Sequence, residues 1–287
     1  MKYKLVRIAE NVHSIHSVEH GETFHPVIGP AAEAEALYVE QLRLRQRLEA
    51  HTGDFIVWDI GLGAAANAVT VLRATQHIPC SLKLFSFEHT LDPLRFSLEH
   101  ASTLKYLEGY EAPIQNVLDQ HRAQFKNGAQ QVDWRLMLGD FPTLLEQLNE
   151  KTSPLEKIPA PHAILFDPFS PAKNPGMWTP LVFQNLFRCL TPEHPCALAT
   201  YSRSTFVRIS LLLGGFFVGV GHATGEKEET TKAANTLSLL EEPLDLKWLW
   251  RVLKSGSAEP MWDGVYRQSA LKVETWEKLK KHPQFFH

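Results

Sequence analysis

Residues 163–178, AILFDPFSPAKNPGMW, contain the side chains with the clearest capacity for chemistry. The stretch begins with four apolar residues, typical of a buried strand, and this run ends on Asp167 and is stopped by Pro168. Open α/β sheets bind ligands at the carboxyl ends of their strands, so this carboxylate is a candidate for the reacting centre. We expect a proline-stiffened loop that holds the acid, backbone carbonyls and the rings of Phe169 and Trp178 around a reacting group. The alternative is a proline-rich connection with both rings in the core.

A glycine-rich turn is the second candidate. Residues 55–60, FIVWDI, indicate a buried strand, Gly61-Leu62-Gly63 follows at once, and a helix is predicted over residues 65–74. Strand, glycine turn and helix in this order are typical of the nucleotide-binding start of a doubly wound fold, because glycine lets a ligand approach the backbone closely. The third glycine of a dinucleotide site is Ala66 here, which would crowd a pyrophosphate.

Two further acids follow predicted strands. Glu88 ends the strand over residues 82–87, where an acid typically holds a ribose diol, although it could instead sit at the start of the helix that Asp92-Pro93 opens. Asp140 follows the strand over residues 134–138. It could accept a hydrogen bond from an adenine amino group, or it could cap the helix beginning at Phe141.

The remaining elements would position these residues in a doubly wound α/β fold. A hairpin is expected over residues 3–20, and a helix starts at Pro30 and continues to Leu48. A helical stretch over residues 91–125 should break near Gly109 and Pro113. Other predicted segments are a surface loop over 150–161, helices over 180–189 and 204–213, strands over 196–200, 216–220 and 236–240, and a mobile segment over 221–234.

Composition limits the possible classes of protein. The chain has 287 residues, 44% of them hydrophobic, and a net charge of −3. This is enough apolar content for a sizeable core, and any contact with nucleic acid must come from a local basic patch. No apolar run reaches about 18 residues, so no membrane span is expected. The N-terminus lacks the apolar core of a signal peptide.

Two residue types could suggest a metal or a disulfide. Three widely spaced cysteines, an odd number, favour buried thiols in a reducing cytoplasm over a disulfide framework or a zinc site. The histidines at positions 13, 16, 20 and 25 fit no zinc spacing. We therefore expect no metal.

The pattern of motifs resembles the class I S-adenosylmethionine-dependent methyltransferases. More specifically, FDPFSPAKNPGMW resembles the D-x-F-x-P-x-x-N-P-x-x-W signature of the methyltransferase module of the MnmC family, which finishes 5-methylaminomethyluridine at the wobble position of certain tRNAs. The resemblance covers most of residues 1–240. Its other parts are GETFHP at 21–26, Glu35 with Tyr38-Val39, DIGLGAAAN at 59–67, ATYSRSTFVR at 199–208 and the following GGFFVGVG.

The resemblance implies a cofactor, a partner and roles for residues. S-adenosylmethionine would be the cofactor and tRNA the partner, with no metal and no membrane. Catalytic roles fall to Asp167, Pro168 and Phe169. Cofactor-binding roles fall to Glu35, Asp59, Gly61, Gly63, Asn67, Glu88 and Asp140, and substrate-binding roles to Lys173, Trp178, Arg203 and Arg208. Domain boundaries are expected at 1–50 for the hairpin and helix, 51–242 for the methyltransferase domain and 243–287 for a C-terminal extension.

Two departures from the family bear on these expectations. The family's third glycine, as in G-x-G-T-G-x-N, is Ala65 here, and this substitution affects cofactor affinity or the shape of the loop. Bifunctional members also carry an FAD-dependent oxidase domain, for which 287 residues leave no room. We therefore expect a stand-alone methyltransferase that receives its aminomethyl group from other enzymes.

The chemistry of such a reaction suits the candidate residues. An alkylammonium has a pKa of about 10, with lysine as the guide, so the site must hold the neutral amine, align it and take up its proton. Asp167 and a carbonyl of the Pro168 loop can fix the amine hydrogens, and Phe169 and Trp178 could stack on an everted uracil. The cationic candidates Lys173, Arg203 and Arg208 could contact phosphates or be ordinary solvated charges.

Two other classes stay open. One is an aminopropyltransferase, which uses the same fold and a related sulfonium but needs a strongly acidic cleft for its polyamine acceptor. The other is a degenerate RNA-binding module that has lost its cofactor, for which Ala65 is the one supporting feature.

Overall fold

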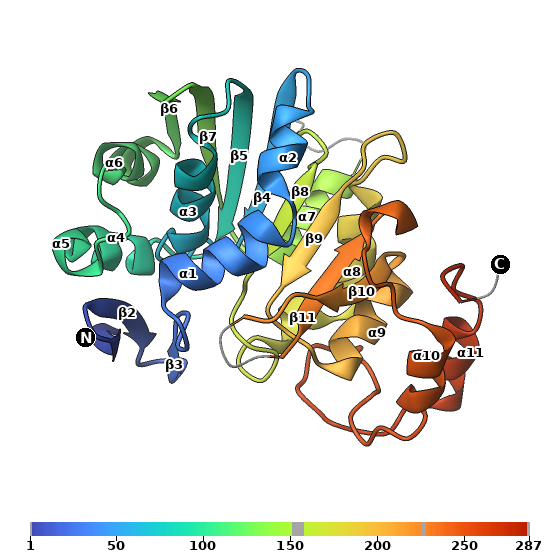
Figure 1. Ribbon diagram of the computed structural model, residues 1–287. Coiled ribbons are helices and arrows are strands. Elements are labelled where there is room, and N and C mark those ends of the chain that lie inside the picture. The colour runs from blue at the N-terminus through green and yellow to red at the C-terminus, as the bar shows by residue number, and fades with distance from the viewer. Residues whose placement is uncertain (1, 151–157, 225–227, 286–287) are drawn as a thin grey trace.

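A twisted, mostly parallel sheet with helices on both faces forms the body of the protein (Figure 1). The computed structural model describes residues 2–150, 158–224 and 228–285. Within these residues the sheet has eight strands in the order β10-β11-β9-β8-β4-β5-β7-β6. The strands are β4 (Asp54–Ile60), β5 (Ser81–Glu88), β6 (Arg122–Asn127), β7 (Gln130–Leu138), β8 (Ala163–Phe166), β9 (Ala197–Thr200), β10 (Phe217–Gly221) and β11 (Thr230–Ala234). The expected doubly wound α/β class is confirmed.

The register of the parallel strands determines which residues meet at the carboxyl edge. Ile60 of β4 pairs with Phe87 of β5 on one side and with Phe166 of β8 on the other. The next residue on each strand is therefore Gly61, Glu88 or Asp167. Because these strands run in the same direction, the glycine turn and both acids lie at one edge of the sheet.

Two apolar cores cover the two faces of the sheet. Side chains alternate along β4, so that Val57 packs in one core and Trp58 in the other. The first face is covered by α1 (Pro30–Ala34), the π-helix η1 (Glu35–Glu40), α2 (Leu44–Glu49), α3 (Ala66–Thr75), α4 (Asp92–Glu99), α5 (Ala101–Leu104) and α6 (Glu111–Gln120). The second is covered by α7 (Phe141–Asn149), η2 (Pro175–Trp178), α8 (Pro180–Arg188), α9 (Thr205–Gly214), α10 (Leu246–Val252) and α11 (Val273–Leu279). Strands buried on both faces explain the continuous apolar runs in the sequence.

A small antiparallel sheet precedes these layers. It consists of β1 (Tyr3–Ala9), β2 (Val12–Ser17) and β3 (Glu22–Thr23), and the predicted hairpin is its first part. Tyr3 and Ile15 pack against Ala64, the residue after the glycine turn. Figure 1 shows this sheet at the lower edge of the molecule, on the opposite side from α10 and α11. It brings residues 20–26 to the carboxyl edge of the central sheet.

Three predictions of secondary structure are wrong. Residues 236–240 do not form a strand but contain the 3-10 helix η3 (Leu237–Leu239), while β11 comes from the segment that we expected to be mobile. β11 is inserted between β9 and β10 with all five residues buried, and its buried Lys232 is paired with Glu241. Pairing with β9 and β10 and this ion pair stabilise the strand, although its polar sequence had favoured a mobile segment. The helix expected to reach residue 125 ends at Gln120, where left-handed His121 turns the chain into β6.

The predicted loop over residues 150–161 lies mostly outside the described residues. None of the helices in the described ranges is long and apolar enough to cross a bilayer. The same residues contain no cluster of three or more His, Cys, Asp or Glu side chains that could hold a metal ion.

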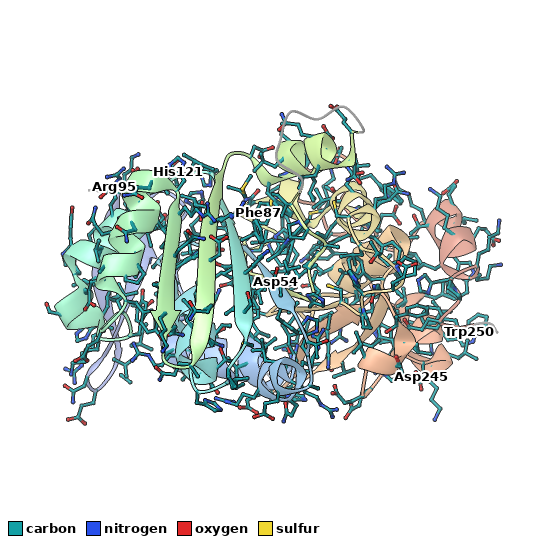
Figure 2. The ribbon with its side chains drawn as sticks, turned by 90° about the horizontal axis from the view of Figure 1, so that it is seen from above. Asp54, Phe87, Arg95, His121, Asp245 and Trp250 are labelled. Atoms are coloured by element: carbon teal, nitrogen blue, oxygen red, sulfur yellow. The ribbon has the colours of Figure 1, made fainter. Side chains whose placement is uncertain are left out.

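Viewed from above, Arg95 and His121 lie at one end of the molecule and Asp245 and Trp250 at the other (Figure 2).

Candidate functional site

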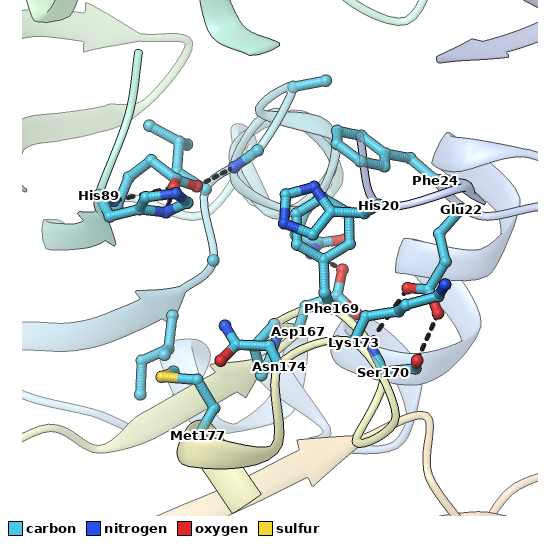
Figure 3. Close-up of a pocket in the computed structure, with 18 of the residues that line it drawn as sticks. His20, Glu22, Phe24, His89, Asp167, Phe169, Ser170, Lys173, Asn174 and Met177 are labelled. Atoms are coloured by element: carbon cyan, nitrogen blue, oxygen red, sulfur yellow. Dashed lines mark hydrogen bonds and ion pairs between the residues drawn. The ribbon is translucent and has the colours of Figure 1, made fainter. Parts of the chain in front are cut away.

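A pocket of about 800 Å³ opens at the carboxyl edge of the sheet. Three parts of the chain line it: the turn after β4, the ends of β5 and β7, and the loop after β8. Residues 20–26 of the N-terminal segment also line it (Figure 3), as do Glu33 and Tyr201. The size is within the range of cofactor and small-molecule sites. The pocket therefore brings together the two stretches that the sequence singled out.

Asp167 is an acid of the pocket whose side chain is only 15% exposed. Its Oδ2 accepts a hydrogen bond from Asn67 Nδ2 at 2.7 Å, and His25 Nε2 lies 3.6 Å away. Burial raises the pKa of Asp167, while the neighbouring His25 and the Asn67 hydrogen bond oppose that rise. The carboxylate is thus held in one orientation by polar neighbours and is shielded from water.

His25 is a site residue that sequence reasoning assigned to no role. Its backbone is left-handed, with φ 47°, and its ring lies between two acids, 3.8 Å from Glu33 Oε2 on one side and near Asp167 on the other. The GETFHP stretch was noted for its family resemblance, and that was the available signal. Glu33 had no strand-end position to mark it, although it faces the pocket from α1.

The Glu88 carboxylate binds the backbone of the glycine turn. Glu88 Oε2 accepts from Gly63 N at 2.8 Å, and Oε1 accepts from His89 N at 2.8 Å. The hydrogen bond with Glu88 is the main cause that raises the pKa of His89. Gly61 has φ 90°, and a Cβ there would lie 2.7 Å from the Asp167 carbonyl oxygen. Glycine is required at this position because the two loops touch.

Asp140 both lines the pocket and caps a helix. Its Oδ2 accepts from Thr143 N at 3.1 Å and from Thr143 Oγ1 at 2.7 Å, which is the capping arrangement for α7. The predicted contact with an adenine amino group stays a prediction.

Phe169 faces the pocket as part of an aromatic group. The His20 ring is stacked on it, with centroids 4.0 Å apart and planes 11° from parallel, and Phe24 approaches edge-on at 5.5 Å. Figure 3 shows His20 and Phe169 overlapping above Asp167. Any base that stacks here meets the His20–Phe169 pair.

Trp178 does not line the pocket, which corrects its predicted role as a stacking platform. It is fully buried in η2, packs edge-on against Phe166 and donates its indole N–H to the Phe169 carbonyl at 3.0 Å. Tyr201 donates its hydroxyl to the Pro168 carbonyl at 3.0 Å. These two hydrogen bonds hold the backbone of the loop on both sides of Phe169.

Two predicted cofactor ligands lie elsewhere. Glu35 is ion-paired with Arg45 outside the pocket, and Glu33 occupies the pocket-facing position of this helical segment. Asp59 is fully buried and accepts from Ser86 Oγ at 2.9 Å, since its place one residue before the end of β4 turns it into the core.

The three cationic residues that were predicted to bind substrate lie in different surroundings. Arg208 is buried and donates to Thr230 O and Thr231 Oγ1, so it is a structural residue and its prediction as a phosphate contact is wrong. Lys173 lines the pocket. Arg203 is exposed, lies 3.9 Å from Glu228 and does not line the pocket, so its role stays a prediction.

The residues at the glycine turn suit an adenosyl sulfonium ligand. Asn67 lines the pocket, and its Oδ1 is buried and accepts no hydrogen bond from the described residues. Glu88 oxygens retain acceptor capacity for hydroxyl groups. Five carboxylates line the pocket and favour a cationic ligand: Glu22, Glu33, Glu88, Asp140 and Asp167.

Comparisons with known proteins agree with this geometry. A family model described as S-adenosyl-L-methionine-dependent methyltransferase matches residues 105–236. The bifunctional protein MnmC of tRNA 5-methylaminomethyl-2-thiouridine biosynthesis from Pseudomonas putida is 28% identical over 235 residues, 77% of this chain and 33% of that protein. The same-named protein of Ralstonia nicotianae is 28% identical over 259 residues, 86% of this chain and 35% of that protein. The chain is therefore similar to about a third of each of these MnmC proteins.

A solved structure supports the same fold over almost the whole chain. MnmC2 from Aquifex aeolicus has a TM-score of 0.69 and 20% identity, and the match covers 98% of this chain and 83% of that one. The resemblance to MnmC and the class I fold that we expected from the sequence are therefore confirmed. The chain spans about a third of the length of the MnmC proteins that it matches.

Proposed function

We propose that this chain is an S-adenosylmethionine-dependent N-methyltransferase that converts 5-aminomethyl(-2-thio)uridine to 5-methylaminomethyl(-2-thio)uridine at the tRNA wobble position. The observation that carries the proposal is the placement of Asp167. It is held by Asn67 and His25 in the same pocket as the Gly61–Gly63 turn and Glu88. The names of the MnmC relatives supply the substrate class.

In this proposal, one side of the pocket holds the cofactor. Glu88 would accept from the ribose hydroxyls, the Gly61–Gly63 turn would lie against the ligand, and Asn67 Oδ1 offers a further acceptor. When bound, S-adenosylmethionine supplies an activated methyl group on a sulfonium centre. The carboxylates around it balance that positive charge.

The other side handles the amine. Asp167 accepts hydrogen bonds from the amino group and directs its lone pair toward the methyl donor. The amine must lose one proton in the course of the reaction. The Asp167 carboxylate takes up this proton, or passes it to His25 Nε2 at 3.6 Å from Oδ2. The Pro168 carbonyl, held by Tyr201, is a second acceptor.

The uracil ring would stack on the His20–Phe169 pair. Stacking on aromatic side chains is the usual way in which proteins hold unpaired bases. Lys173 lies at the same wall and would contact a flanking phosphate. A reaction on tRNA and the free cysteines of the described residues support a cytoplasmic location as part of this proposal.

One observation favours a second candidate, an aminopropyltransferase. Five carboxylates and one lysine line the pocket, and such an acidic cleft also suits a polyamine. Both reactions bring a cation into the site, so the charge of the pocket supports both. The methyltransferase proposal is preferred because the MnmC relatives match most of the chain.

The test uses labelled S-adenosylmethionine and tRNA that carries 5-aminomethyluridine. We expect label to enter that tRNA and not a tRNA with an unmodified wobble uridine. Parallel reactions contain putrescine and decarboxylated S-adenosylmethionine. Aminopropyl transfer without tRNA methylation would replace the proposal with the second candidate. A calorimetric titration that detects no cofactor binding would favour the degenerate RNA-binding module.

A further inference from the structure

The C-terminal extension, residues 243–287, differs in charge from the rest of the protein. It contains eight Lys or Arg and five Asp or Glu residues, a net charge of +3. The whole chain carries −3, so residues 1–242 carry −6. All eight cationic residues lie in the described part of the chain. The extension is therefore the basic part of an otherwise acidic protein, and such a region attracts polyanions.

Acidic side chains of the extension form hydrogen bonds and ion pairs with other residues of the extension. Glu259 is buried and accepts from Trp262 Nε1, Thr275 Oγ1 and Lys272 N, each at 2.9 Å. Asp263 pairs with Arg267. Among the described residues no ion pair joins Lys278 to a carboxylate, and its ammonium lies 4.6 Å from the centroid of the Trp262 ring.

Trp262 is both exposed and fixed. Its exposed fraction is 44%, yet the buried Glu259 holds the ring nitrogen and Lys278 lies over one face. Val265 and Tyr266 follow it and are also exposed. We call Trp262, Val265, Tyr266 and Lys278 the Trp262 surface. A rigid aromatic ring beside a cation is the arrangement on which single-stranded RNA bases stack.

The Trp262 surface is connected to the proposed active site. Gly264, with φ 67°, approaches so closely that a Cβ on it would lie 3.4 Å from Gly176 Cα. Gly176 belongs to η2, two residues after Asn174, which lines the pocket. The Tyr266 ring contacts Phe206, three residues after the exposed Arg203. In Figure 1 the connection between α10 and α11 runs along the lower edge of the molecule, where the loop after β8 also lies.

We propose that the Trp262 surface binds RNA next to the nucleotide in the pocket, stacking an unpaired base on Trp262 and placing Lys278 at the backbone. This inference rests on the proposed function, because it assigns the surface to the same tRNA. Its occupant follows from the positive charge of the extension and the fixed aromatic ring. A second protein molecule would instead be expected to cover the aliphatic residues without a need for the lysine.

The extension contains matched control residues. Trp250 is exposed at 55% and contacts Trp276 of α11, and Lys280 lies 6.0 Å from the Trp276 centroid and pairs with Glu277. Lys280 caps the end of α11 one turn after Trp276, so Lys278 faces away from them. Figure 2 shows Trp250 at the outer end of the molecule. Trp250→Ala and Lys280→Ala remove the same side-chain types outside the Trp262 surface.

The experiment measures dissociation constants by anisotropy with fluorescent tRNA carrying 5-aminomethyl-2-thiouridine, at several salt concentrations. We expect Trp262→Ala to weaken binding about 10-fold and to raise KM while kcat changes less than about twofold. Lys278→Ala should weaken binding several-fold and make the slope of log affinity against log salt shallower by about 1. Trp262→Phe, which keeps a ring, should recover most of the affinity. The two control variants should bind like wild type.

Unchanged tRNA affinity in the Trp262→Ala protein, or an equal loss in Trp250→Ala, would overturn the inference. A change in sedimentation with tRNA affinity intact would show instead that the surface joins copies of this chain. The failure of the proposed function looks different, because the wild-type protein would then transfer no methyl group to the modified tRNA. If wild type methylates tRNA and Trp262→Ala keeps its KM, this inference alone is wrong.

Discussion

The imidazole of His25 lies between two acids, with Nε2 3.6 Å from Asp167 Oδ2 and Nδ1 3.8 Å from Glu33 Oε2. His25 comes from the N-terminal segment, whereas Asp167 follows the strand β8, so the pair exists only when the small sheet is packed on the central one. The side chains of His25 and Asp167 are 11% and 15% exposed. Electrostatic interactions between them are stronger here than in water, because little solvent screens them.

The first prediction concerns Asp167→Asn. Asparagine keeps the shape and one acceptor oxygen but removes the negative charge that orients the amine and accepts its proton. The methylation rate should fall by about 10²-fold or more, while S-adenosylmethionine affinity stays nearly the same. Because burial raises the pKa of Asp167, the loss of this buried charge should leave the melting temperature unchanged or raise it.

Labelled methyl transfer and a melting curve on one preparation check this prediction. If Asp167 only ended the strand, the variant would melt early yet turn over at the wild-type rate. That result would remove the loop after β8 from the active site.

The second prediction concerns His25→Gln. Glutamine retains a hydrogen-bonding group but cannot carry the amine proton, so kcat should fall by about 10-fold or more. The profile of kcat against pH should also change shape, which a purely structural role would not produce. His16→Gln is the matched control, since His16 belongs to the same small sheet, bonds Thr23 and does not line the pocket. Equal rates for wild type and His25→Gln would contradict a role in proton transfer.

The third prediction concerns Glu88→Ala. The Glu88 carboxylate would bind the ribose, and it also holds the Gly63 amide, so its removal loosens the turn. S-adenosylmethionine binding should weaken by about 1.5–3 kcal/mol, measured by calorimetry, through loss of charge-assisted hydrogen bonds. Glu88→Gln, which keeps an acceptor, should lose less. Unchanged affinity in a folded Glu88→Ala protein would exclude the ribose role.

The carboxyl-edge residues could be predicted from sequence because their signals are local. Gly61, Glu88 and Asp167 each follow an apolar run, and parallel strands must bring such positions to the same edge. The prediction that Asp59 binds the cofactor was wrong because Asp59, two residues before Gly61, still lies within β4 and points into the core. The sequence pattern does not show which of the last strand residues leaves the sheet.

The N-terminal part of the site could not be predicted in the same way. His25, which also contacts Glu33, reaches Asp167 across more than a hundred residues of chain, and no periodicity encodes that contact. The family resemblance gave a cofactor role to Glu35, although the π-helix turns Glu35 toward Arg45. Trp178 was expected beside the reacting group, with burial in the core as the alternative, and the structure buries the ring and uses its indole to hold the Phe169 carbonyl.

The fourth prediction concerns Asp59 and pH. Burial raises the pKa of Asp59 to about 7, well above its value of about 4 in an unfolded chain. Between these values the folded protein binds more protons than the unfolded one, so stability falls as pH rises, and the penalty is complete above about 7. Asp59→Asn removes this penalty. Its advantage in free energy of unfolding over wild type should be about 2–3 kcal/mol larger at pH 8 than at pH 5.

Denaturant unfolding of both proteins at these two pH values measures the difference. Ser86→Ala, which removes the hydroxyl that donates to Asp59, is a useful comparison because it should enlarge the wild-type pH dependence. A stability difference that does not vary with pH would show that Asp59 is ionised in the folded protein across this range.

The last prediction concerns Ala65, where relatives with the G-x-G-T-G-x-N pattern have glycine. Ala65 is buried at the start of α3, adopts φ 61° and ψ 18°, and does not line the pocket. The alanine therefore takes the left-handed conformation that glycine prefers, and Ala65→Gly should stabilise the protein by about 1 kcal/mol. Cofactor affinity should change less than about twofold, because the shape of the turn is already the same. Gly61→Ala is the matched opposite change, since its Cβ would collide with the Asp167 carbonyl and should lower both stability and activity. If Ala65→Gly instead tightened S-adenosylmethionine binding 10-fold or more, the alanine would be a determinant of cofactor affinity rather than a strained replacement.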